Sequence, residues 1–204
     1  MKIIGIVGGI ASGKSFYSDL LEKQGAAVFK ADLAGHEVLN ERTIRQKIRQ
    51  RWGDAIILPD GSVDRSQLAG IVFQRDEDSA MERLYLESLL FPAIKQRFEN
   101  FLDESETAGF YYIVLDAALL LEAGWDKLCD VIIFVDTPDD VRLKRAIDRG
   151  WTPEEFADRE ATQFSMKKKR KKADVVLKGD LSPEESEAAL LAAKKKYSSA
   201  AVIK

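Results

Sequence analysis

Apolar and polar positions alternate along the chain with two different spacings, which predicts strands in alternation with helices. Short continuous apolar runs are typical of strands that are covered on both faces of a parallel sheet. These runs lie at residues 3–7, 26–29, 110–115, 131–135 and 174–177. Between them, apolar residues recur at helical spacing. The expected helices cover residues 16–23, 41–52, 65–73, 76–103, 138–149, 153–171 and 182–197.

The order of these elements predicts a three-layer α/β fold with a parallel sheet, because strands that alternate with helices give right-handed crossovers. The long helical stretch between the second and third strands is too large for a simple crossover, so we expect it to form a cap over the site. Within it, Pro59-Asp60-Gly61 predicts a turn and Pro92 predicts a kink. We expect a core from residues 1–40, 104–148 and 173–204, a helical substrate domain over 41–103 and a lid over 149–172.

The first strand runs directly into Gly-Gly-Ile-Ala-Ser-Gly-Lys-Ser at residues 8–15. This is the G-x-x-x-x-G-K-S spacing of a phosphate-binding loop (P-loop), in which the backbone approaches phosphate and the next helix aims its N–H groups at it. Lys14 supplies charge to the β- and γ-phosphates, and the Ser15 hydroxyl is a hard ligand for Mg²⁺. A chance glycine-rich turn is the alternative, which the strand before and the helix after argue against. We expect ATP or GTP to bind at Gly9, Ile10, Ala11, Ser12, Gly13, Lys14, Ser15 and Phe16.

Composition narrows the class of protein. The 204 residues are 46% hydrophobic and 32% charged, as in a globular protein with one sizeable core. The net charge of −3 does not favour nucleic acid or an anionic membrane as a partner. Cys129 is the single cysteine, which excludes an internal disulfide and indicates a reducing compartment, the cytoplasm. Cys129 is interpreted as a buried side chain that fills space in the core rather than a reactive thiol. No segment is apolar over the roughly eighteen residues that a membrane helix needs.

Three acidic residues follow predicted strands. Ligands of an open parallel sheet bind beyond the carboxyl ends of its strands. Asp32 follows the second strand, Asp116 ends the third, and Glu122 lies in the next loop. A carboxylate there could deprotonate an attacking hydroxyl or hold Mg²⁺. For Asp32 the alternative is a helix N-cap, and for Asp116 the two interpretations stand equal.

Basic residues gather late in the chain. Arg142, Arg145, Arg149 and Arg159 precede an unbroken basic run, Lys167–Lys172. Cationic side chains on a helical flap would neutralise charge in a phosphoryl-transfer transition state, so a lid is favoured for Arg145, Arg149 and Arg159. Solvated surface is the alternative for these arginines and the preferred interpretation of the lysine run.

These features resemble the dephospho-coenzyme A kinases, which are ATP-dependent enzymes of the last step of coenzyme A synthesis. The loop is similar to that family's Gly-Gly-Ile-Gly-Ser-Gly-Lys-Ser, and Ala31-Asp32 matches its Asp-Ala-Asp. Its Asp-Gly-x-Leu-Asp-Arg segment resembles Asp60–Arg65, the most particular of the motifs. Further matches are Leu68, Val72-Phe73, Leu86-Glu87, Pro92, Ile94, Leu119–Glu122, Arg145, Arg149, Gln163 and Ala173-Asp174.

The resemblance implies an α/β P-loop core, a helical coenzyme-A-binding domain and a helical lid. It implies transfer of the ATP γ-phosphoryl group to the ribose 3′-hydroxyl of dephospho-coenzyme A with Mg²⁺, and leaves the oligomeric state open. By carry-over, Asp32 would be the general base, Lys14 would stabilise the transferring charge, and Ser15 would hold Mg²⁺. Arg145 and Arg149 would close on ATP. The implied substrate-binding residues are Asp32, His36, Asp64, Leu119 and Glu122.

Several positions depart from the family pattern. Ala11 replaces a loop glycine, and its methyl group would crowd the phosphates unless its φ is negative. The lid opening at 149–152 is one residue short. The other departures are Lys30 for Asp, His36 for Arg, Phe91 for His, Ala118 for Pro, and Lys178-Gly179 in place of a segment with Asn. Because Lys14, Ser15 and Asp32 are retained, we expect the chemistry to be retained and the substrate and adenine contacts to differ.

Two alternatives remain. The chain could be another small-molecule P-loop kinase, against which the large insertion 41–103 argues because it suits a large acceptor. It could also be a non-catalytic nucleotide-binding protein that uses Lys167–Lys172 to bind RNA. Retention of Asp32 argues against this second alternative, because a protein that only binds needs no base.

Overall fold

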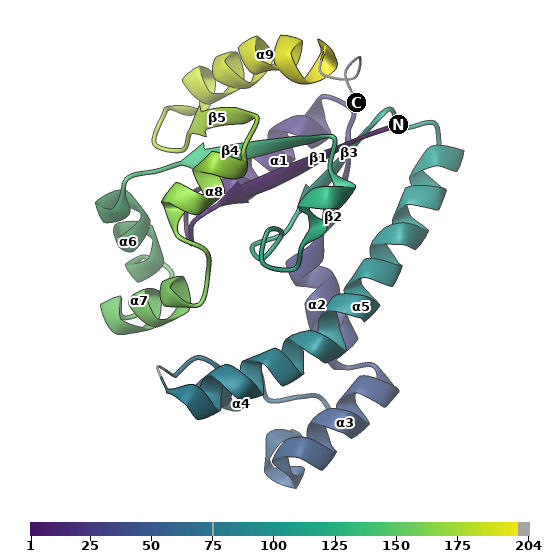
Figure 1. The fold of residues 1–204 in the computed structure, drawn as a ribbon, viewed down its shortest axis with the longest axis vertical. Coiled ribbons are helices and arrows are strands. Elements are labelled where there is room, and N and C mark those ends of the chain that lie inside the picture. Colours follow the sequence, from purple (N-terminus) through teal and green to yellow (C-terminus); the bar gives the residue numbers. More distant parts are fainter. Residues whose placement is uncertain (75, 200–204) are drawn as a thin grey trace. The chain divides into compact units, whose positions relative to one another are not determined.

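A computed structural model of the protein describes residues 1–74 and 76–199. Its sheet has five strands in the order β2-β3-β1-β4-β5, and every neighbouring pair is parallel (Figure 1). The strands are β1 (Lys2–Gly8), β2 (Ala27–Lys30), β3 (Tyr112–Asp116), β4 (Val131–Asp136) and β5 (Val175–Lys178). The predicted three-layer α/β fold is confirmed.

The chain connectivity places the end of β1 at the point where the strand order reverses. From β1 the chain continues to β2 and β3 on one side and later to β4 and β5 on the other. Ile6 of β1 pairs with Asp116 of β3, and Gly8 pairs with Val135 of β4. Diverging connections at such a switch point leave room for a ligand beyond the strand ends. The P-loop begins at this point.

The described residues form nine α-helices. The chain divides into two compact units. The first unit comprises Met1–Lys30 and the chain from Phe101 onward, and the second comprises Ala31–Asn100. The helices are α1 (Lys14–Lys23), α2 (Ala31–Leu39), α3 (Arg42–Trp52), α4 (Arg65–Val72), α5 (Glu77–Thr107), α6 (Asp139–Ile147), α7 (Pro153–Ala161), α8 (Met166–Lys172) and α9 (Pro183–Ser199). Single 3₁₀ turns lie at Asp54–Ile56 and Trp125–Leu128. No helix among the described residues is long and apolar enough to cross a membrane.

Helices cover the sheet of the first unit on both faces. Apolar side chains of α1 and α9, including Leu20 and Leu190, pack with Ile4 and Ile6 of β1 in one buried cluster. On the other face α8 lies against β1 and β4 (Figure 1). Because both faces of the sheet are covered, successive residues of each strand are buried, which explains the continuous apolar runs in the sequence. Burying each large aliphatic side chain stabilises the fold by about 2 kcal/mol.

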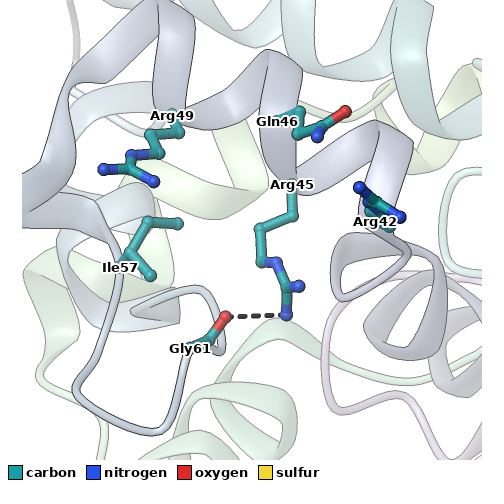
Figure 2. A pocket seen from close by; sticks show the side chains of 6 residues that line it. All are labelled: Arg42, Arg45, Gln46, Arg49, Ile57 and Gly61. Carbon is teal, nitrogen blue, oxygen red and sulfur yellow. Dashed lines mark hydrogen bonds between the residues drawn. The ribbon is translucent and has the colours of Figure 1, made fainter.

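The second unit is a small helical domain. Ile44 and Ile48 of α3 are buried, and another face of this helix carries arginines around a hollow beside Ile57 and Gly61 (Figure 2). The Asp64 side chain caps α4 by accepting hydrogen bonds from the backbone N–H groups of residues 66 and 67, at 2.9 and 3.1 Å. Such a cap satisfies N–H groups that have no partner within the helix.

One predicted helix, 153–171, is two helices in the structure. A capping box at Thr152 and Glu155 starts α7, which ends at Ala161 with Thr162 as its C-cap. Ser165 then caps α8, because its hydroxyl accepts a hydrogen bond from the Lys168 N–H at 3.3 Å. The single-helix expectation was wrong because serine and threonine compete for backbone groups and favour helix ends. Elsewhere, Pro92 lies inside α5, which continues on both sides of it.

Candidate nucleotide-binding site

The loop between β1 and α1 has the form that phosphate binding requires. Gly13 precedes α1 with φ 94°, a left-handed conformation that favours glycine. The N-cap position makes no side-chain hydrogen bond to the first turn of this helix. An uncapped helix N-terminus after a glycine turn is a ready anion site.

Lys14 spans the loop that it follows. Its ammonium donates a hydrogen bond to the Gly9 carbonyl oxygen at 3.0 Å, which keeps the charge over the loop. Ser15 and Phe16, the next two residues of α1, are exposed. The loop therefore presents a cation and a hydroxyl beside the N-terminus of α1.

A second cation reaches the loop from α6. The Arg145 guanidinium donates to the Ala11 carbonyl oxygen at 3.4 Å and to the Gly179 carbonyl oxygen at 2.8 Å. Thr137 donates from its hydroxyl to the Ser12 carbonyl oxygen at 2.7 Å. A Cβ atom added to Gly179 would lie 2.0 Å from the Thr137 hydroxyl oxygen and 2.3 Å from the Ser12 carbonyl oxygen. A side chain at position 179 would therefore clash with the P-loop and with Thr137 in this structure.

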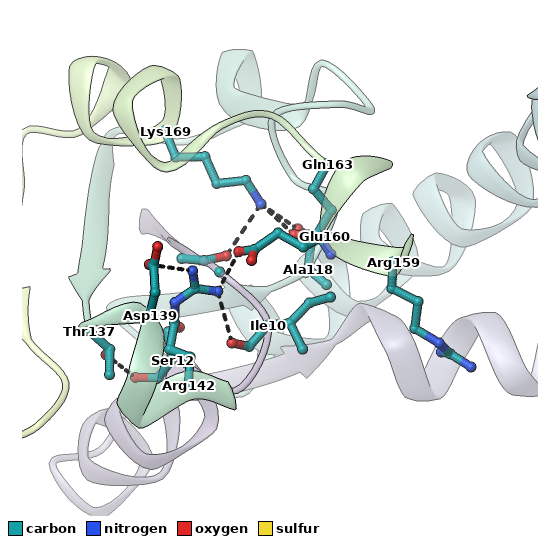
Figure 3. A network of polar contacts seen from close by, with 12 residues as sticks. Ile10, Ser12, Ala118, Thr137, Asp139, Arg142, Arg159, Glu160, Gln163 and Lys169 are labelled. Carbon is teal, nitrogen blue, oxygen red and sulfur yellow. Dashed lines mark hydrogen bonds and ion pairs between the residues drawn. The ribbon is translucent and has the colours of Figure 1, made fainter. Parts of the chain in front are cut away.

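Arg142 is buried beneath the loop, with an exposed fraction of 1% (Figure 3). Its guanidinium donates to Asp139 at 2.8 Å, pairs with Glu160, lies 3.4 Å from the Ile10 carbonyl oxygen, and stacks 5.4 Å from the Phe156 ring centroid. Burial works to lower the pKa of this guanidinium, but the bonds to Glu160 and Asp139 raise it overall. Arg142 therefore remains a buried cation that supports the loop through its backbone.

Lys169 was predicted to lie on the surface with the rest of the run Lys167–Lys172, and this prediction is wrong. Its side chain is 2% exposed, and its ammonium donates to Gln163 at 2.7 Å and to the Gly8 carbonyl oxygen at 3.3 Å (Figure 3). It also lies 3.4 Å from a Glu122 carboxylate oxygen. Burial lowers its pKa, against the opposing effect of Glu122. The run of six basic residues gave no sign of which one faces inward; the packing of α8 on β1 and β4 selects Lys169.

Ala11 occupies the loop with φ 56°, the only described residue other than glycine with a positive φ. The condition of a negative φ is therefore not met. The Ala11 methyl group is buried with Ala146 of α6 and Phe156 of α7, so the side chain packs against these two helices. This packing offsets part of the roughly 1–2 kcal/mol that a left-handed conformation costs alanine.

The remaining residues expected in the first unit have different surroundings. Asp116 accepts a hydrogen bond from the buried Ser18 hydroxyl at 2.8 Å, and Glu122 accepts one from the Phe164 N–H at 2.6 Å. Leu119 is half-buried in the same loop as Glu122. Arg149 is exposed, and over the described residues its side chain has no hydrogen bond or ion pair with the loop. The Arg159 guanidinium lies 4.5 Å from the Trp151 ring centroid, also outside the loop.

The second unit brings together Asp32, His36 and Arg65. Asp32 is exposed in the first turn of α2, which begins at Ala31, so the carboxylate lies inside the helix rather than at its N-cap. His36 follows one turn later and is half-buried. Burial, and then the charge of Arg65, lower the pKa of its imidazole, whereas the charge of Asp32 works to raise it. Asp64 serves as the cap of α4 described above.

Comparison with known proteins agrees with this architecture. A sequence model of the dephospho-CoA kinase family matches residues 2–185. A dephospho-CoA kinase of Geobacter sulfurreducens is 40% identical over 92% of this chain and 94% of its own. One from Geobacillus kaustophilus is 35% identical over 95% of this chain and 96% of its own.

Solved structures share the fold. A protein from Thermus thermophilus is 27% identical and superposes with a TM-score of 0.79 over 96% of both chains. Dephospho-CoA kinase from Campylobacter jejuni is 24% identical, with a TM-score of 0.67 over 96% of this chain and 98% of its own, and supports the fold alone. With the P-loop and its supporting cations in place, these matches show that the chain belongs to the dephospho-CoA kinase family, whose members are kinases that use ATP.

Proposed function

We propose that this protein transfers the γ-phosphoryl group of ATP to the ribose 3′-hydroxyl of dephospho-coenzyme A, giving coenzyme A and ADP. The observation that carries this proposal is the P-loop between β1 and α1, with Lys14 and Arg145 on it, in a chain of this family. The single free cysteine suits a reducing cytoplasm, where we place the enzyme.

Positioning and electrostatics account for the catalysis. Phosphoryl transfer passes through a loose transition state with charge spread over the phosphoryl oxygens. The protein therefore acts by positioning the reactants and stabilising this charge rather than by covalent catalysis. Lys14 and the N-terminus of α1 bind the β- and γ-phosphates, and Arg145 adds a second cation at the loop. Arg142 and Lys169 hold the loop backbone in place through its carbonyl oxygens.

Magnesium fits the residues at this site. The Ser15 hydroxyl is exposed in the first turn of α1, next to Lys14, and offers the hard oxygen that Mg²⁺ prefers. The described residues contain no cluster of three or more acidic, histidine or cysteine ligands. This is expected for Mg²⁺ in kinases, where phosphates and water complete the shell. When bound, the ion neutralises charge on the phosphate oxygens.

The general base and most of the proposed acceptor-side residues belong to the second unit, and Leu119 and Glu122 belong to the first. Asp32 is the proposed general base that receives the proton of the 3′-hydroxyl, and its exposure leaves it accessible to substrate. His36, Asp64, Leu119 and Glu122 are proposed acceptor-side residues, with residues 41–103 as the coenzyme-A-binding region. Residues 149–172, which include α7 and α8, are proposed as the lid, with Arg149 closing on ATP.

The test is ADP release by the purified protein with Mg·ATP, with and without dephospho-coenzyme A, and mass identification of coenzyme A. Acceptor-dependent turnover that gives coenzyme A supports the proposal. ADP release that needs no acceptor, or turnover only with another alcohol, contradicts it. Lys14→Ala is the matched variant for the loop and should lose both ATP affinity and turnover.

A further inference from the structure

A hollow of about 260 Å³ lies in the second unit, between α3 and the segment that follows it (Figure 2). Its walls are Arg42, Arg45, Gln46, Arg49, Ile57 and Gly61. The three arginines are spaced three and four residues apart, so they line one face of α3, whereas Ile44 and Ile48 are buried on another. The helix therefore presents a cationic wall to a concave space.

All the charged residues of α3 are basic. The helix contains no acidic residue. Its basic residues are Arg42, Arg45, Lys47, Arg49 and Arg51. Like charges three and four positions apart destabilise a helix, so nothing in the stability of α3 itself favours arginine at both 42 and 45.

Carboxylates neutralise only part of this charge. Arg51, which does not line the hollow, donates to Glu82 at 2.6 and 2.9 Å, and the lining residue Arg49 pairs with Asp54. Arg42 and Arg45 have no carboxylate partner among the residues the structure describes.

One lining arginine is held in position. The Arg45 guanidinium donates to the Gly61 carbonyl oxygen at 2.9 Å across the hollow, so one N–H is used and the remaining donors of the fork are left for another acceptor. Asp60, in the same turn, is occupied by the Ser62 backbone N–H and hydroxyl at 2.9 and 2.6 Å. No ion pair joins Asp60 to Arg45 among the described residues.

We propose that this arginine pocket, formed by Arg42, Arg45 and Arg49, binds a diphosphate group. Planar guanidinium forks match phosphate oxygens in pairs, and several of them along the wall of one concave space suit adjoining phosphates better than a single carboxylate. The group can come from two sources. One is the diphosphate within dephospho-coenzyme A, which rests on the proposed function, and the other is a free phosphorylated molecule.

The experiment is calorimetric titration of the full-length protein with inorganic pyrophosphate, after excess ADP has filled the P-loop. The same titration with dephospho-coenzyme A separates the two sources. Arg42→Gln/Arg45→Gln is the test variant. Lys47→Gln is the matched control, because it removes a charge from the same helix at an exposed residue outside the pocket.

We expect the double variant to weaken pyrophosphate binding at least about tenfold and the control to leave it unchanged. If the double variant also weakens the binding of dephospho-coenzyme A, the pocket binds the diphosphate of the acceptor. If the binding of dephospho-coenzyme A is unchanged, the pocket binds a separate phosphorylated molecule. No pyrophosphate binding by the ADP-filled protein, or an equal loss in Lys47→Gln, overturns the proposal. Binding of RNA but not pyrophosphate also overturns it. Turnover by the double variant at saturating acceptor tests the proposed function separately.

Discussion

The ammonium of Lys169 lies 3.3 Å from the carbonyl oxygen of Gly8, the residue at which β1 ends and the P-loop begins. The same ammonium reaches Glu122, whose side chain is 11% exposed, in the loop after β3. One buried cation thus joins α8, the loop after β3 and the start of the P-loop.

We expect Lys169→Met to lower the free energy of unfolding by about 3 kcal/mol, because it leaves the Glu122 carboxylate and the Gly8 carbonyl without their partner. It should also raise the KM for ATP more than that for the acceptor, since the change lies at the P-loop. Urea unfolding and steady-state kinetics measure the two effects.

Lys171→Met is the control, because Lys171 is exposed on the same helix and should change stability by less than about 0.5 kcal/mol. Adding Glu122→Gln to Lys169→Met should recover part of the loss. Additive losses would show that the two charges are not coupled.

Asp32→Asn should lower turnover by about two to four orders of magnitude and leave ATP affinity unchanged, because the amide cannot accept the proton of the hydroxyl. Single-turnover kinetics and ATP titration measure these quantities. Near-normal turnover would leave Asp32 as an acid that only stabilises the first turn of α2.

Ala11→Gly should change the free energy of unfolding by less than about 1 kcal/mol. Relief of the positive φ is offset by the lost packing against Phe156 and by the added freedom of the unfolded chain. Ala11→Val should cost about 2 kcal/mol or more, since a β-branched residue is a true outlier at this φ. Denaturant unfolding of the two variants checks this, and equal stabilities would contradict a left-handed Ala11.

His36 is the sole histidine, so its titration can be followed as one NMR signal. Burial and Arg65 hold its pKa below the ordinary 6.5. The unfolded chain therefore binds more protons near that pH, so this contribution to stability is present above pH 6.5 and is lost as the pH falls through the native pKa.

Substitution at the two neighbours should move the His36 midpoint in opposite directions. Asp32→Asn removes the charge that raises the pKa and should lower the midpoint further, and Arg65→Gln should raise it. A midpoint that neither variant moves would mean that these charges do not face His36.

Cys129 should resist alkylation in the native protein. Burial first, and then the charges of Asp126, Asp130 and Asp174, raise the pKa of its thiol to about 12, so little thiolate forms near neutral pH. Because the native pKa is raised, this group's contribution to stability is lost as the pH rises above the ordinary 9.0. Iodoacetamide labelling with and without urea is the measurement, and equal rates would contradict the raised pKa of this half-buried thiol.

Periodicity was sufficient to predict the strands, since runs such as 131–135 can be continuously apolar only when helices cover both faces of a sheet. The G-x-x-x-x-G-K-S spacing was sufficient for the loop, because few other sequences place a strand, a glycine turn and a helix N-terminus in that order. Helix ends inside 153–171 were less predictable, because the competition between Ser165 and the helix backbone depends on what α8 packs against.

The sequence by itself determined the α/β order, the P-loop and the family, because each is a local pattern of residue types. Only the tertiary structure decided that Lys169 is buried within an otherwise exposed basic run, that Gly179 faces Thr137, and that arginines of α3 line one hollow. The reason is physical. A residue's type sets its charge and size, whereas its burial and partners depend on which distant segments fold against it.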